Sequence, residues 1–174
     1  MDWLLPRLMA SFQWMHCHEA AHHVLRGLSA ASLAHARLLM LHAVQQGLFP
    51  WWRANERPAT FVLQHNALAM PHAFEMDMLN HLHEVAFDET GHRALQVMLM
   101  SSSDWFRRRL RWSLVNQGFE ELVSRRYASF LMEFAVANLP MDFVLEVHQR
   151  FTPALRKREV SSHVYTAVRR RLQQ

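Results

Sequence analysis

The scarcity of glycine is the feature that most restricts what this chain can fold into, since it has four glycines in 174 residues. Average usage of about 7% would give about 12. Tight hairpin turns depend on glycine for backbone conformations with positive φ, so few glycines leave little room for a sheet built from hairpins. The length corresponds to one domain, at roughly 150 residues per domain, with a sizeable core.

Helical periodicity dominates the sequence, and we find no repeat of fixed period. Proline, glycine and serine positions divide the chain into about eight expected helices. These cover residues 6–26, 29 or 32 to 47, 59–69, 71–100, 105–116, 119–138, 140–151 and 153–172, with a cap at Ser101–Asp104 before the helix at 105. Residues 48–58 hold two prolines and no periodicity, which predicts a loop that contains Trp51 and Trp52. The expected fold is an all-α, single-domain helical bundle over residues 1–174.

A single cysteine, Cys17, excludes a disulfide framework and a cysteine-based zinc or iron–sulfur site. No stretch reaches the ~18 apolar residues of a membrane helix. The N-terminus begins with an acidic residue and reaches a histidine cluster before any small-residue cleavage site, which is unlike a signal peptide. We therefore expect a cytoplasmic protein with no membrane association.

Charge divides the chain into two halves. Residues 1–92 contain five Arg, eight acidic residues and 11 of the 13 histidines, whereas residues 93–174 contain 14 basic residues and seven acidic ones. The first half therefore has the residue types of a metal or acid–base site. The second half has the residue type that contacts phosphates and carboxylates.

One group of candidate metal ligands lies in the expected helix at 71–100. Glu89 and His92 form a Glu-x-x-His pair, which places both side chains on one helix face, one turn apart. Glu84 and Asp88 belong to a neighbouring stripe of the same helix. A carboxylate on an apolar stripe needs a cation, a strong hydrogen-bond donor or water. The alternative is a wide solvated face on which these acids are simply exposed.

Glu19 and His22 repeat the Glu-x-x-His spacing in the first expected helix. Two such pairs from different helices, completed by a Glu from each of two others, hold the metals of di-iron and di-manganese bundles. The pattern resembles the ferritin-like and heme-oxygenase-like di-iron carboxylate proteins. The resemblance implies metal ligands at Glu19, His22, Glu89 and His92, with His18, Glu84, Asp88 or Glu133 completing or orienting them. The implied metal is iron, or else manganese or zinc.

The same first-helix residues form a competing motif. His18, Glu19 and His22 make His-Glu-x-x-His, in which two histidines hold zinc and the Glu acts as a base. A zinc protease of that class has sheet structure before this helix, and the chain has no room for one. The metalloprotease is therefore the less favoured hypothesis.

Two functions from different classes follow. The leading hypothesis is a metal-binding helical bundle, an iron-carboxylate oxidoreductase acting on a small substrate near Trp51 and Trp52. The alternative is a non-enzymatic helical protein that uses its Arg-rich half on nucleic acid or an acidic protein. The basic clusters that favour this alternative are Arg107–Arg109 with Arg111, Arg125–Arg126, Arg156–Arg158 and Arg169–Arg171.

Overall fold

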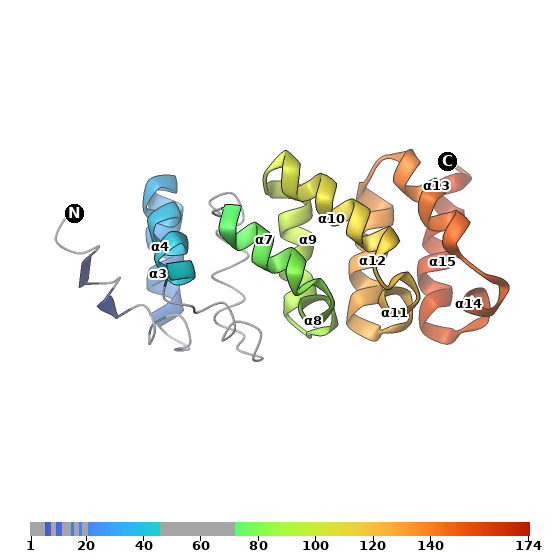
Figure 1. Ribbon diagram of the computed structural model, residues 1–174, viewed down its shortest axis with the longest axis horizontal. Helices are drawn as coiled ribbons and strands as arrows, with labels where there is room; N and C mark the ends of the chain where they lie inside the picture. The colour runs from blue at the N-terminus through green and yellow to red at the C-terminus, as the bar shows by residue number, and fades with distance from the viewer. Residues whose placement is uncertain (1–5, 8–9, 12–14, 16–17, 19–20, 46–71) are drawn as a thin grey trace.

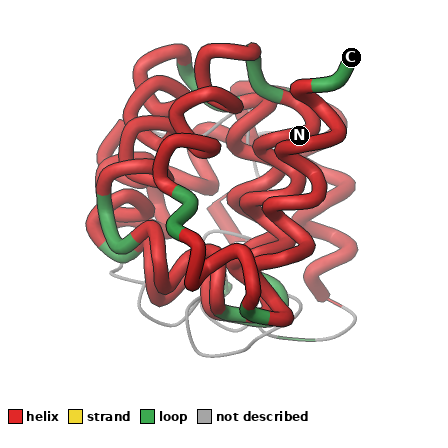
Figure 2. Tube along the Cα trace, turned by 90° about the vertical axis from the view of Figure 1, so that its right-hand side faces the viewer, coloured by secondary structure: helices red, strands yellow, loops and turns green. Residues whose placement is uncertain are grey.

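The computed structural model describes the chain apart from residues 1–5, 8–9, 12–14, 16–17, 19–20 and 46–71. Its elements are α3 (Ala21–Ala31), α4 (Leu33–Gln45), α7 (His72–Asn80), α8 (Leu82–Phe87), α9 (Gly91–Ser101), α10 (Asp104–Asn116), α11 (Phe119–Ser124), α12 (Arg126–Asn138), α13 (Met141–Arg150), α14 (Pro153–Lys157) and α15 (Glu159–Leu172). The described residues contain helices and no strand, as Figure 2 shows, which confirms the expected all-α fold. Within this described part, no helix has both the length and the apolar character needed to cross a bilayer.

From residue 72 onward the helices repeat as three-helix units, stacked along the long axis of the molecule (Figure 1). The units are α7–α9, α10–α12 and α13–α15, and each consists of a first helix, a short second helix and a third helix. The third helices α9, α12 and α15 pack side by side in one layer, and the first helices α7, α10 and α13 form the other. The units begin at His72, Asp104 and Met141, so their lengths are unequal and the sequence has no fixed period to detect.

Each unit is interrupted before its third helix by one extended residue, at the same structural position in all three. These residues are Asp88 (φ −78°, ψ 143°), Arg125 (φ −90°, ψ 134°) and Arg158 (φ −75°, ψ 137°). The carbonyl of each accepts a hydrogen bond from the N–H four residues later, at His92, Ser129 and Ser162. The interruptions divide the helices expected at 71–100, 119–138 and 153–172, and they align the three third helices residue by residue.

A buried phenylalanine anchors the first helix of each unit. Phe74, Phe106 and Phe143 each occupy the third position of their helix and are at most 1% exposed. Burial of such a side chain stabilises the fold by about 1.5–3 kcal/mol. The repeated position shows that the three units share one packing scheme.

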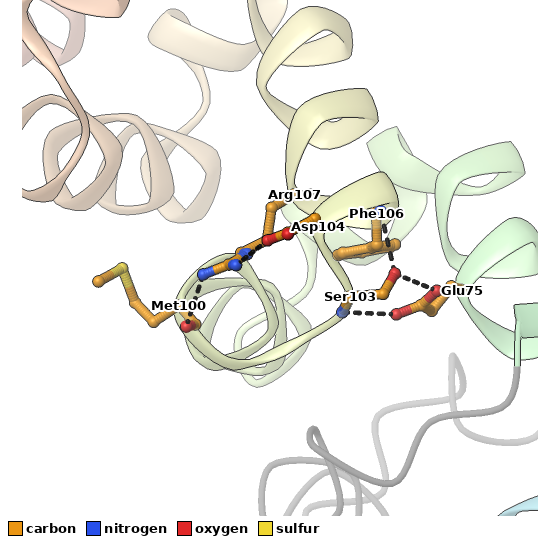
Figure 3. Close-up of polar contacts among 6 residues, drawn as sticks. All are labelled: Glu75, Met100, Ser103, Asp104, Phe106 and Arg107. Carbon is orange, nitrogen blue, oxygen red and sulfur yellow. Dashed lines mark hydrogen bonds and ion pairs between the residues drawn. The ribbon is translucent and has the colours of Figure 1, made fainter.

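A buried carboxylate joins the first unit to the second. Glu75 on α7 is 3% exposed and accepts hydrogen bonds from the backbone N–H of Ser103 at 3.1 Å and from its hydroxyl at 2.8 Å (Figure 3). The Ser103 hydroxyl oxygen in turn accepts from the N–H of Phe106 and caps α10. This confirms the cap predicted just before residue 105, and it explains how an acidic residue is tolerated in the core.

Candidate functional site

The predicted ligand Asp88 is a capping residue. Its Oδ1 accepts hydrogen bonds from the Thr90 N–H at 2.8 Å, from the Thr90 hydroxyl at 2.7 Å and from the Gly91 N–H at 2.6 Å. Three donors on one oxygen hold the turn that leads into α9. Glu89 lies in that same turn and is exposed, so it does not share a helical face with His92.

His92 is buried between two third helices. Its ring stacks on Tyr127 of α12 with a centroid distance of 5.6 Å, and it lies 5.9 Å from the ring of Phe130. The Nδ1 atom is 3.1 Å from the carbonyl oxygen of Asp88. Desolvation lowers the pKa of His92 and outweighs the opposing hydrogen bond to Asp88, so the neutral ring is favoured. His92 therefore packs one unit against the next.

The remaining predicted ligands do not complete a metal site in the part of the chain that the structure describes. Glu84 is exposed on α8 and His18 is exposed near the N-terminus. Within the described residues, no three His, Cys, Asp or Glu side chains are arranged to hold a metal ion. Glu19 and the side chain of His22 lie outside the described residues, so that pair stays a prediction.

The exposed face of the third-helix layer carries two rows of aligned side chains. One row, here called the planar row, consists of Arg93, Phe130 and His163, which are all exposed. Each follows directly after one of the aligned residues His92, Ser129 and Ser162. The second, here called the polar row, lies three residues further along and consists of Gln96, Glu133 and Thr166. Each unit thus presents one flat group and one hydrogen-bonding group at equivalent places.

Contacts between neighbouring helices fix these rows. The Gln96 Nε2 donates to the Phe130 carbonyl at 3.1 Å, which tethers the polar side chain of one unit to the backbone of the next. Partial burial raises the pKa of the Glu133 carboxyl, an effect that the nearby His163 partly opposes. Packed helices lie about 8–10 Å apart, which leaves room for one flat ring between successive planar side chains. The face is therefore suited to a chain of stacked rings.

The basic clusters do not form one face. Arg107–Arg111 lies on α10 in the first-helix layer, whereas Arg126 begins α12 and Arg169–Arg171 ends α15. Several guanidinium groups pack on rings, as Arg156 does on Tyr165 at 5.0 Å and Arg125 on Phe87 at 5.4 Å. An Arg-rich half in sequence is thus spread over both layers of the structure.

Sequence reasoning missed most of the two rows. Of their members it singled out only Glu133, and that as a residue completing a metal site. The signal that was present is a small buried residue, Gly91, Ala128 or Ser161, followed two positions later by a planar group. Unequal spacing between the units conceals this pattern from a search for fixed periods.

No family model matches this sequence, and no curated protein matches it. Among solved structures, the crystal structure of PUF-8 in complex with PBE-RNA superposes with a TM-score of 0.82 at 12% sequence identity. The match covers 97% of this chain and 55% of that chain. The chain has the fold of that protein. It spans about half of the neighbour's length.

This fold overturns the resemblance to ferritin-like and heme-oxygenase-like di-iron proteins. From residue 72 onward the units stack along an axis instead of surrounding a common interior. The description of the chain as a metal-binding iron oxidoreductase is likewise wrong, since neither the fold nor the described side chains support it.

Proposed function

We propose that this chain binds single-stranded RNA along the planar and polar rows of the α9, α12 and α15 face. The observation that carries the proposal is the alignment itself, in which three consecutive units place a flat group and a polar group at equivalent positions. The structurally similar PUF-8 was crystallised with PBE-RNA. Helical repeats of this kind read RNA one base per repeat, using two or three side chains each.

The planar row supplies stacking surfaces. Unstacked RNA bases stack on aromatic rings, on imidazoles and on guanidinium planes, which are the groups that Phe130, His163 and Arg93 present. Each base stacked on an aromatic side chain contributes about 1–3 kcal/mol. Phe130 is 44% exposed although it is a large apolar residue, which fits a surface that a base covers.

The polar row supplies base selection. An ionised Glu133 only accepts hydrogen bonds, so its base must present donors, as guanine does through N1–H and its exocyclic amine. Gln96 has its amide nitrogen directed to the Phe130 carbonyl, which leaves its oxygen to accept from a base. The exposed Arg126 and Arg158, at the starts of α12 and α15, are placed to contact phosphates. A protein acting on RNA in this way fits the expected cytoplasmic location, which stays a prediction.

Fluorescence anisotropy of the full chain with labelled single-stranded RNA tests this proposal. Phe130→Ala is expected to weaken binding by about 5- to 150-fold, the equivalent of about 1–3 kcal/mol. The matched control is Leu145→Ala, which removes a side chain of similar exposure (47%) from the first-helix layer and should leave affinity unchanged. Equal affinity of Phe130→Ala and wild type, or equal loss in both variants, would contradict the proposal.

A second experiment, selection from a randomised RNA pool, tests which bases the polar row prefers. Glu133→Gln exchanges an acceptor-only group for one that also donates, so it should relax the preference for guanine at one position of a randomised RNA pool. Thr166→Val on α15 should affect a neighbouring position instead. A Glu133→Gln variant with an unchanged base preference at every position would remove the polar row from the proposal.

A further inference from the structure

The junction between α10 and α13 forms a second surface, on the first-helix layer and away from the proposed RNA face. Two grooves lie along it. One, of about 330 Å³, is lined on α10 by Arg107, Arg108 and Arg111, and also by Leu139 and Pro140. The other, of about 310 Å³, is lined by Trp112, Val115, Asn116, Glu146, Gln149 and Arg150. We call this surface the α10–α13 seam.

Positive charge is concentrated at one end of the seam. Helix α10 carries four Arg and one Asp. Arg107 donates to Asp104 and to the Met100 carbonyl (Figure 3), and Arg111 donates to both carboxylate oxygens of Asp142 at 3.1 Å. These two guanidinium groups are held in place by their carboxylates.

Arg108 and Arg109 provide the outward-facing charge of the seam, because both are exposed. The Arg109 guanidinium lies 4.8 Å from the centroid of the Trp112 ring, which combines a cation with an aromatic surface. Because Arg107 and Arg111 are paired with carboxylates, the positive charge that attracts a ligand comes from Arg108 and Arg109 on the exposed side of α10.

Apolar surface lies beside this charge. Trp112 lines the second groove and is 47% exposed, although it is a large apolar residue. Tryptophan and arginine are the residue types most enriched among the energetically dominant positions of protein interfaces. The combination suits a protein segment that carries both an acidic and an apolar side chain.

We propose that the α10–α13 seam binds an extended acidic segment of a partner protein. Arg108 and Trp112 lie one helical turn apart, about 6 Å at 1.5 Å per residue. An extended peptide advances about 3.3 Å per residue, so its acidic and apolar side chains are two positions apart. The acid lies against Arg108, and the apolar group packs on Trp112.

Charge also sets the direction of the segment. The groove at the Arg108 end is lined by three Arg and by Asp104, whereas Glu146 and Arg150 at the Trp112 end offset each other, so the acid is attracted to the Arg108 end. RNA is the less suitable ligand for this seam, because one aromatic ring already packed with Arg109 offers no series of stacking surfaces.

The test uses the full chain and a fluorescein-labelled synthetic peptide that carries Asp and Leu two positions apart, as Asp-Ser-Leu, in a Gly–Ser background. We expect Arg108→Glu and Trp112→Ala each to weaken peptide binding by about tenfold, the equivalent of about 1.4 kcal/mol. Arg169→Glu is the matched control, because it reverses an exposed charge on α15 outside the seam. It should leave peptide affinity within about twofold of wild type.

A charge exchange separates docking from loss of folding. A peptide with Lys in place of Asp should bind Arg108→Glu more tightly than it binds wild type. Absence of peptide binding to wild type, or equal loss with Arg169→Glu, would overturn the proposal. It would also be overturned if single-stranded RNA displaced the peptide and Arg108→Glu weakened RNA binding instead, since RNA would then occupy the seam.

Discussion

The turn between α8 and α9 makes Gly91 a position where even a methyl group is excluded. A Cβ added there would lie 2.4 Å from the Val85 carbonyl oxygen, 3.1 Å from Val85 Cγ1 and 3.2 Å from Asp88 Cβ. The closest of these atoms belongs to the backbone, which cannot rotate away as a flexible side chain does. Gly91→Ala must therefore displace the turn itself.

The expected cost of Gly91→Ala has two parts. Forcing an extra carbon into a packed site costs about 1–3 kcal/mol. The same turn contains the hydrogen bonds from the Thr90 and Gly91 N–H groups to Asp88, and disruption of that cap adds about 1 kcal/mol. The sum of about 2–4 kcal/mol corresponds to a fall in Tm of about 5–15 °C for a chain of this length.

The equivalent positions in the other units accept larger residues. Ala128 and Ser161 are both buried there, and the Ser161 hydroxyl donates to the Leu155 carbonyl. In those units only one extended residue separates the second helix from the third, whereas residues 88–90 do so in the first unit. The restriction at Gly91 is thus specific to the longer turn.

Urea unfolding followed by circular dichroism at the helix band measures the effect. The control is Gly27→Ala within α3, where an added Cβ meets nothing within 4 Å. Higher helix propensity should stabilise that variant by about 0.5–1 kcal/mol, so the two Gly→Ala changes have opposite signs. A Gly91→Ala variant as stable as wild type would refute the steric reasoning and the turn geometry on which it depends.

Three further predictions concern buried or capping side chains. Asp88→Ala should destabilise the chain by about 1–2 kcal/mol in urea unfolding, while Asp88→Asn, which keeps an acceptor oxygen, should recover most of that loss. Glu75→Ala removes the acceptor of two hydrogen bonds from Ser103 and should lower the free energy of unfolding by about 1–3 kcal/mol, with an intermediate loss for Glu75→Gln. No loss of stability in either variant would show that the packing of α7 against α10 does not depend on this link. Burial lowers the pKa of His92, so the unfolded state binds the proton of this ring more readily than the folded state does. The free energy of unfolding should therefore fall as the pH drops below about 6.5. A His92→Gln variant should show a smaller fall, and an equal fall would assign the pH dependence to other groups.

The fold class was predictable because its determinants are local. Few glycines and helical periodicity are properties of short stretches of sequence, and so is the serine cap that Ser103 provides at the start of α10. The interruptions at Arg125 and Arg158 carry no proline or glycine to mark them. Packing of the second helix against its neighbours sets their position, and that information is spread over distant residues.

The candidate site was not predictable for a related reason. The spacing of Glu89 and His92 indicates a shared face only if the helix continues through both, and the turn held by Asp88 breaks it between them. His92 does face the interior of the molecule, but the interior there is the junction between two units. Phe130 and Gln96 can be recognised as parts of one surface only when α9 and α12 are placed side by side, since the Gln96 side chain donates to the Phe130 carbonyl.

The middle position of α12 in the third-helix layer has a consequence for how the molecule opens. It packs against α9 on one side and α15 on the other, and each unit contacts mainly its neighbours instead of a common centre. Stability in such an array spreads by nearest-neighbour coupling. The amide protons of α12 should therefore exchange with solvent most slowly among the three third helices. Substitution of Gly91 should speed amide exchange around Tyr127, which contacts His92. Its effect on amide exchange around Tyr165, on α15, should be smaller.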